Sequence, residues 1–253
     1  MSQINMSYCT TLFFIQTLNM QQITILLPVK NGEKYIADAI ESILAQTFND
    51  FELLIFDDDS KDRTLKITRG FKDKRMKIFQ SRNGYINNLN KGIEIAQGAY
   101  IARMDADDMM HPDRLMTQIE IMEKNPSIAV CGSWIKVFGE HINPYILTQD
   151  VAGRLENLLD KLKIANFISH PSVMIRRDFL MTHKLSYQHY PYVEDYKLWV
   201  EIAKKKGSFY IVPKPLLAYR LSQDQVTITH SQEMIYNAAL LRKEIQEYLQ
   251  KNI

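Results

Sequence analysis

The sequence predicts an α/β fold, because strand-like and helix-like segments alternate along its first half. Short runs rich in β-branched and aliphatic residues are separated by segments whose apolar residues recur at helical spacing. Two acidic clusters directly follow strand-like runs. At 253 residues, the chain can form one large domain or two small ones.

The first half predicts a unit of four strands and three helices. The strands are expected at 23–29, 51–56, 76–80 and 99–104, and the helices at 34–46, 61–71 and 84–97. The first helix is predicted from apolar residues at i, i+3, i+4, i+7 and i+8, starting at Ile36. Ligands of open α/β sheets bind beyond the carboxyl ends of the strands, which is where the acidic clusters 57–59 and 105–108 are expected.

The second half has a less regular pattern. Helices are expected at 112–124, 154–163 and 195–206, and strands at 127–138, 169–177, 208–212 and 216–221. A last helix begins near Gln232, and its residues Leu241, Ile245 and Tyr248 share one face. We expect this helix to pack on its own domain with a solvated basic face; contact of that face with anionic lipid is the alternative.

Composition excludes some classes of protein. The net charge is +2, and no run of Lys and Arg interleaved with aromatic residues suggests a nucleic-acid partner. Cys9 and Cys131 are too few for a disulfide framework, which favours a reducing cytoplasm. Residues 1–19 are interpreted as an N-terminal extension, or as the result of a mis-assigned start with translation beginning at Met20. Their apolar part, 8–18, is too short to span a bilayer.

The second acidic cluster predicts a cation site. Asp105, Asp107 and Asp108 directly follow the apolar-rich run AYIARM. Carboxylates crowded at a strand end repel one another, and a divalent cation would hold them there. Mg²⁺ and Mn²⁺ prefer such hard oxygen ligands, usually alongside the phosphates of a substrate.

Five motifs occur in an order that resembles the family 2 glycosyltransferases. They are PVKNGEKYI at 28–36, FDDDSKD at 56–62, LNKGIEIAQGAYIARMDADD at 89–108, HPSVMIRR at 170–177 and VEDYKLW at 193–199. The resemblance runs from about Gln22 to Tyr219 and implies one continuous domain of the GT-A fold with a mixed central sheet. It implies a Rossmann-like nucleotide-sugar-binding half at 20–111, a variable acceptor-binding and catalytic half at 112–222, and a C-terminal helix within 223–253.

The resemblance also implies an activity, which is inverting, metal-dependent transfer of a sugar from a nucleotide diphosphate, with UDP expected. Asp58 matches the residue that accepts a hydrogen bond from the base. Asp107 matches a ligand of Mn²⁺ or Mg²⁺, while Asp105 would meet the ribose, the metal or the waters of the metal. Asp195 matches the catalytic base, and Glu194 would bind the acceptor or orient that base. The acceptor is expected to be a glycan or lipid-linked saccharide of a bacterial surface polysaccharide or lipooligosaccharide.

Other matched positions are expected at the substrate: Pro28, Lys30, Asn31 and Glu33 of the first motif, together with His170 and Arg220. Two positions depart from the pattern. Lys30 stands where many relatives have a Tyr that stacks on the base, so its stem could cover the base or its amine could reach a phosphate. Ser222 stands where many relatives have His, and Arg220 could still pair with phosphate.

Simpler interpretations remain for each acidic position: Asp58 in a turn or helix cap, Asp107 in a solvated loop, and Asp195 at a helix start. His170 before Pro is more often structural than a site residue. The sequence lacks the glycine patterns of dinucleotide-binding and P-loop proteins. The alternative function is a non-catalytic GT-A-like module that binds a nucleotide or a partner. Location in the cytoplasm is expected, with peripheral contact at the inner membrane as an added possibility, and the oligomeric state stays open.

Overall fold

The computed structural model describes residues 22–140, 142–222 and 229–252, and its centre is a ten-stranded sheet. The strand order is β3-β2-β1-β4-β9-β6-β10-β5, with β7 paired to β6 and β8 paired to β10. The strands are β1 (Ile23–Val29), β2 (Phe51–Asp58), β3 (Met76–Ser81), β4 (Tyr100–Arg103), β5 (Met109–Met110), β6 (Ile128–Gly139), β7 (Ile142–Leu147), β8 (Gly153–Leu155), β9 (Met174–Arg176) and β10 (Ser208–Leu221). The interpretation of residues 1–19, like Cys9, lies outside the described residues.

The sheet is mixed, as expected. β1 pairs in parallel with β2 and β4, and β2 pairs in parallel with β3. β9 runs antiparallel between β4 and β6, and β10 returns parallel to β6. The helices are α2 (Ile36–Leu44), α3 (Thr64–Thr68), α4 (Tyr85–Ile95), α5 (Arg114–Lys124), α6 (Leu158–Leu162), α7 (Arg177–His183), α8 (Glu194–Lys204) and α10 (Ser231–Lys251), with a 3₁₀ turn at His170–Ser172.

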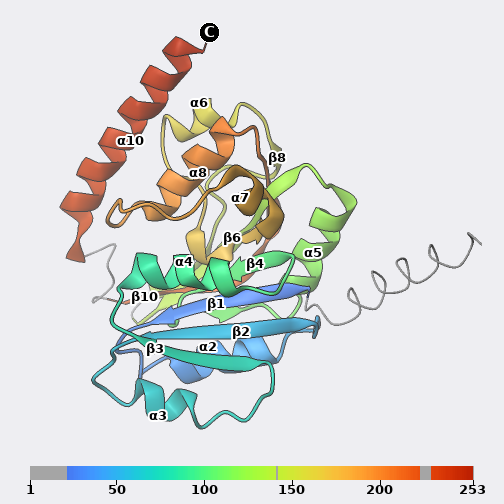
Figure 1. Cartoon of the computed structure of the whole chain (residues 1–253), viewed down its shortest axis with the longest axis vertical. Helices are drawn as coiled ribbons and strands as arrows, with labels where there is room; N and C mark the ends of the chain where they lie inside the picture. Colours follow the sequence, from blue (N-terminus) through green and yellow to red (C-terminus); the bar gives the residue numbers. More distant parts are fainter. Residues whose placement is uncertain (1–21, 141, 223–228, 253) are drawn as a thin grey trace, which may run out of the picture.

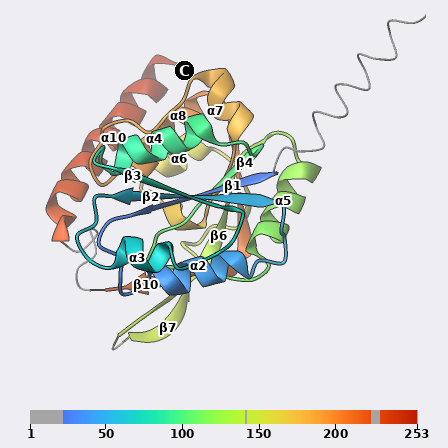
Figure 2. The ribbon, with the colours of Figure 1, turned by 60° about the horizontal axis from the view of Figure 1, so that its bottom comes forward.

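Helices cover both faces of the parallel strands. Figures 1 and 2 show α2 and α3 on one face of β1, β2 and β3, and α4 on the other. Alternate residues of β1 accordingly enter two separate apolar clusters. Ile25 packs in the cluster that contains Ile40 of α2, and Leu26 packs in the cluster that contains Leu89 of α4.

Several local predictions in the second half are wrong because tertiary pairing overrides local pattern. The helix predicted at 154–163 is confined to α6, since Gly153–Leu155 instead pairs antiparallel with β10. The strand predicted at 169–177 begins as the 3₁₀ turn around Pro171 and gives way to α7, which the sequence pattern did not indicate. The two strands predicted at 208–212 and 216–221 form the single strand β10, with register shifts on both sides of Pro215.

The C-terminal helix packs on its own domain, as expected. Leu241 and Ile245 of α10 are fully buried, and the helix contacts α6 and α8. Glu244 of α10 forms ion pairs with Lys197 and Lys204 of α8. Trp199, also on α8, is fully buried and belongs to the core. No helix within the described ranges has the length and apolarity that a membrane crossing requires.

Leu241→Ala is expected to lower the free energy of unfolding by about 2–5 kcal/mol, because it removes a fully buried side chain that the rigid surroundings cannot replace. The neighbouring Leu240 is 45% exposed, so Leu240→Ala is expected to change the free energy by less than about 0.5 kcal/mol. Chemical denaturation of both variants measures this difference. Equal losses would show that α10 does not pack through Leu241.

Candidate active site

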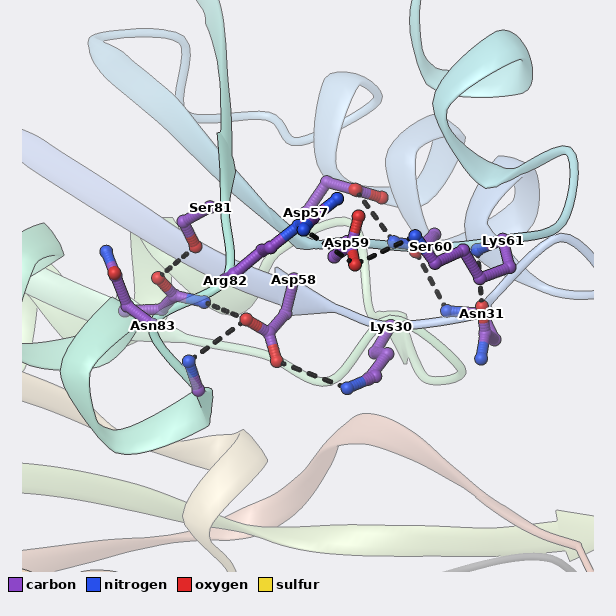
Figure 3. Close-up of polar contacts among 12 residues, drawn as sticks. Lys30, Asn31, Asp57, Asp58, Asp59, Ser60, Lys61, Ser81, Arg82 and Asn83 are labelled. Atoms are coloured by element: carbon purple, nitrogen blue, oxygen red, sulfur yellow. Dashed lines mark hydrogen bonds and ion pairs between the residues drawn. The ribbon is translucent and has the colours of Figure 1, made fainter.

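The carboxyl ends of β1 and β2 hold the first two motifs together. Val29 pairs with Asp57 in the parallel register, so the loops that follow start side by side. The Asn31 backbone N–H donates to Ser60 Oγ at 2.9 Å, and Asn31 Oδ1 accepts the Lys61 N–H at 2.8 Å (Figure 3). Asn31 therefore links the two loops.

The rest of the first motif divides between core and loop. Pro28 is buried within β1, in register with Phe56. The Glu33 N–H donates to Asp62 Oδ2 at 3.0 Å, and the Glu33 carboxylate accepts the Arg63 N–H at 2.8 Å. Glu33 thus also joins the loop after β1 to the residues that lead into α3.

The three consecutive carboxylates after β2 have different surroundings. Asp57 is buried, and its Oδ1 accepts the Ser60 N–H at 3.1 Å, as in a turn. Asp59, whose φ is +58°, pairs with Lys61 at 2.8 Å and with Arg82 at 3.2 Å, and these cations lower the pKa of its carboxyl. Both residues therefore stabilise the loop.

Asp58 occupies a different position, between the loop after β1 and the start of α4. Its Oδ1 accepts the Gly84 N–H at 3.0 Å and is 3.4 Å from Asn88 Nδ2, while Oδ2 lies 3.6 Å from Lys30 Nζ (Figure 3). Ser81 Oγ donates to Asn88 Oδ1 at 2.6 Å, which turns the Asn88 amide group toward Asp58. The Asp58 side chain is 15% exposed and is held in one orientation.

The carboxylates after β4 form a donor set that suits a divalent cation. One oxygen from each of Asp105, Asp107 and Asp108 lies within 4.8 Å of the others. Asp108 is fully buried; its Oδ1 accepts the Arg220 N–H at 2.9 Å, and its Oδ2 has no hydrogen-bond partner. Burial and the charges of its two neighbours raise the pKa of Asp108 well above its usual range. Hard carboxylate oxygens are what Mg²⁺ or Mn²⁺ takes as ligands, so this set of three residues suits such an ion.

Arg220 lies under this acidic loop. Its Nε donates to the Asp107 carbonyl at 2.8 Å, and its guanidinium pairs with Asp38 of α2 at 3.3 Å. The guanidinium also stacks on Tyr35 and Phe138, 4.1 Å and 4.6 Å from the ring centroids. The structure thus places Arg220 as a support for the backbone of Asp107.

Arg103 is a site residue that the sequence analysis missed. It ends β4 and is buried, and its guanidinium donates to both carboxylate oxygens of Asp105, to Oδ2 at 2.6 Å. It also donates to the hydroxyl of Tyr85, the first residue of α4. An Asp105 carboxylate engaged by Arg103 in this way has fewer lone pairs left for a metal.

Glu194 and Asp195 begin α8, and burial and nearby charges change the ionisation of both carboxyl groups. Burial and the Asp195 charge raise the pKa of Glu194 to about 7. The charge of Asp105 also raises this pKa, and the charge of Arg103 lowers it. Burial likewise raises the pKa of Asp195, although hydrogen bonds from the Tyr196 N–H at 2.6 Å and from Asn166 Nδ2 at 3.0 Å favour its charged form. The end of β4 and the start of α8 therefore act on one another electrostatically.

His170 lies in the same region but is enclosed. Its Nε2 is 2.8 Å from the Tyr187 hydroxyl, and its ring contacts the edge of Trp199. Burial and the Arg103 charge lower the pKa of His170 well below its usual range, so the imidazole is neutral at pH 7. The Asn90 side chain of α4 exchanges hydrogen bonds of 2.8 Å with the Tyr187 backbone, which fixes this tyrosine beside His170.

With Asp195 as the base that the resemblance implies, Asn166→Ala is expected to move the acidic limb of the pH–rate profile upward by about one pH unit. A base works only when it is deprotonated, so the rate falls as the pH drops through its pKa. The Asn166 amide stabilises the charged Asp195, and a lost hydrogen bond to a charged group costs about 1.5–3 kcal/mol. The profile of kcat/KM against pH measures the shift. Asn125→Ala is the control, because the Asn125 amide donates to the Ile121 carbonyl and not to Asp195. This control should leave the acidic limb of the profile in place. An acidic limb that moves in neither variant would contradict the role of Asn166.

The sequence of this chain is similar to those of known proteins. Residues 24–182 match the family model described as glycosyl transferase family 2. An uncharacterized glycosyltransferase of Haemophilus influenzae is 31% identical over 246 residues, covering 92% of this chain and 76% of the relative. One of Rickettsia typhi is 28% identical, covering 82% of this chain and 66% of the relative, so the chain spans about two thirds of that protein.

Solved structures show the same fold. A crystal structure of S. aureus TarS aligns with a TM-score of 0.66 at 18% identity, covering 87% of this chain and 71% of that one. A complex of TarS with UDP aligns with a TM-score of 0.67 at 19% identity, covering 87% and 64%. TarS has also been crystallised with UDP-GlcNAc. At this level of identity the likeness identifies the GT-A fold.

Proposed function

The chain belongs to glycosyl transferase family 2, and on that premise we propose that it transfers a sugar from a UDP-sugar to a hydroxyl group with inversion at the anomeric carbon. One observation carries the proposal. At the start of α8 the buried Glu194 stands beside the half-buried Asp195, and the charge of Asp105 in the acidic loop after β4 helps to raise the pKa of Glu194. Donor activation and acceptor activation need these two kinds of group in one place.

The acceptor side of the reaction rests on Asp195. Direct displacement at the anomeric carbon needs one base, which takes the proton from the acceptor hydroxyl as its oxygen attacks. The raised pKa of Asp195 strengthens it as a base, and the hydrogen bonds from Asn166 and from its own helix keep it oriented. Glu194 would bind the acceptor or orient Asp195.

The donor side rests on Asp58, Asp105 and Asp107. Asp58 would accept a hydrogen bond from the base, and Asp105, held by Arg103, would meet the ribose or the waters of the metal. Asp107 would ligate Mg²⁺ or Mn²⁺. When bound there, such an ion supplies Lewis-acid stabilisation of the departing diphosphate. The complexes of TarS with UDP and UDP-GlcNAc support UDP as the nucleotide proposed for this chain.

The acceptor proposed is a glycan or lipid-linked saccharide of bacterial surface polysaccharide or lipooligosaccharide synthesis. The reaction would take place in the cytoplasm, against the inner membrane when the saccharide is lipid-linked. Lys243 and Lys251 on the exposed side of α10 are compatible with such a surface. His170 and Arg220 would act as supporting residues, since both are engaged by protein groups.

A thermal-shift screen of nucleotide sugars, each with and without Mn²⁺, tests the proposal. Ligand that binds only the folded chain raises the melting temperature, and we expect the largest rise for a UDP-sugar together with Mn²⁺. UDP release in the presence of saccharide acceptors then measures transfer. Equal stabilisation by UDP with and without Mn²⁺, and no transfer to any acceptor, would favour a nucleotide-binding module without catalytic activity.

A further inference from the structure

The position occupied by Lys30 differs chemically from the aromatic residue expected at the base. A lysine has no ring to stack on a base, but its amine can donate a hydrogen bond to the edge of the base. Lys30 is 62% exposed, and its amine lies 3.6 Å from Asp58 Oδ2, within ion-pair range but longer than a hydrogen bond (Figure 3). The amine can therefore turn toward a base carbonyl without breaking a hydrogen bond to Asp58.

Asp58 offers one oxygen to a ligand. Its Oδ1 already faces two donors, the Gly84 N–H at 3.0 Å and Asn88 Nδ2 at 3.4 Å, which use its two lone pairs. Its Oδ2 faces Lys30. The pair thus presents a single acceptor beside a cationic donor, and both come from loops that Asn31 and Ser60 hold together.

In the proposed function Asp58 accepts a hydrogen bond from the base; we propose that Lys30 completes the reading of uracil, its amine donating to a ring carbonyl while Asp58 Oδ2 accepts the imide N–H. The inference rests on the proposed function and adds the residue that reads the base together with Asp58. Cytosine has no N–H at the ring nitrogen, so the Asp58 carboxylate would face a lone pair. Guanine presents two adjacent N–H donors to an aspartate that has one open oxygen, so one of them would lose its partner.

Lys30→Met tests this reading, because it keeps the length of the side chain and removes its charge. The dissociation constant of UDP, measured by calorimetry with Mn²⁺, should rise by about 10- to 100-fold, the worth of one hydrogen bond to a charged group. The affinity for uridine, measured by NMR titration, should fall by the same factor, since the lost contact is to the base. The wild-type protein should bind UDP at least about tenfold more tightly than CDP or GDP.

Lys61→Met is the matched control. Lys61 is 69% exposed and pairs with Asp59 at 2.8 Å, one residue beyond Asp58, so the variant loses the same charge from the same loop region. UDP affinity should stay within about twofold of wild type. Equal losses in both variants would mean that positive charge attracts the diphosphate without reading the base, which would overturn the proposal.

Three further results have distinct meanings. A Lys30→Met effect on UDP that is absent for uridine would place the amine at a phosphate and overturn the proposal. Equal wild-type affinity for UDP and GDP would overturn the reading of a single open oxygen on Asp58. Absence of UDP binding to the wild-type protein, with or without Mn²⁺, would instead contradict the proposed function itself.

Discussion

Asp195→Asn is expected to lower kcat for sugar transfer by about 100- to 10,000-fold, the usual contribution of a positioned general base. The amide cannot take a proton from the acceptor hydroxyl. Its oxygen can still accept the Tyr196 N–H, so the start of α8 should keep its conformation. Initial rates at saturating UDP-sugar and Mn²⁺ measure the loss.

Two comparisons separate the loss of the base from general damage. The affinity of Asp195→Asn for UDP should equal that of the wild type, because the proposed base acts on the acceptor. Glu194→Gln should lose less activity than Asp195→Asn, since the role proposed for Glu194 is to bind the acceptor or orient the base, without removing the proton. A turnover number for Asp195→Asn within tenfold of wild type would contradict the assignment of the base.

Asp107→Asn is expected to weaken Mn²⁺ binding by at least about 100-fold. Losing a residue that only supports a metal ligand costs about 10- to 100-fold in affinity, and losing a proposed ligand itself should cost no less. A neutral amide is a poorer ligand than a carboxylate for a hard divalent cation. Calorimetric titration with Mn²⁺ measures the affinity directly, and UDP binding by the variant should no longer respond to Mn²⁺. Transfer should be lost to the same extent as the bound ion.

The control for this variant is Asp160→Asn, which removes a carboxylate that is 61% exposed on α6. It should leave Mn²⁺ affinity within twofold of wild type. If Asp107→Asn also bound Mn²⁺ as the wild type does, the acidic loop after β4 would not be the metal site. Transfer that survived both Asp107→Asn and Asp195→Asn would refute the mechanism.

The part of the fold that the sequence predicted is the part governed by local patterns. β1, β2 and β4 are short apolar runs with polar residues at or just beyond their ends, and parallel pairing brings their carboxyl ends to one edge. That is why the position of the acidic loops could be predicted. β8 and α7 could not be predicted. β8 is three residues paired to β10, and α7 is a single short helix, so neither segment is long enough to show a clear periodicity.

The supporting residues of the site were missed for a similar reason. Arg103 stands in an apolar strand, and only the folded chain shows its guanidinium buried between Asp105 and Tyr85. Asn166 lies in an irregular segment 29 positions before Asp195, the residue it contacts. The run ARMDADD could have indicated the role of Arg103. A charged residue at the end of an apolar strand needs a partner when it is buried, and Asp105 lies two positions further on.

Direct displacement with Asp195 as the only base determines the anomeric configuration of the product. Proton NMR of the product, recorded before any mutarotation or hydrolysis, distinguishes α from β linkage. A donor whose sugar is α-linked to UDP should give a β-linked product. An α-linked product would rule out a single direct displacement, since retention requires a different mechanism at the anomeric carbon.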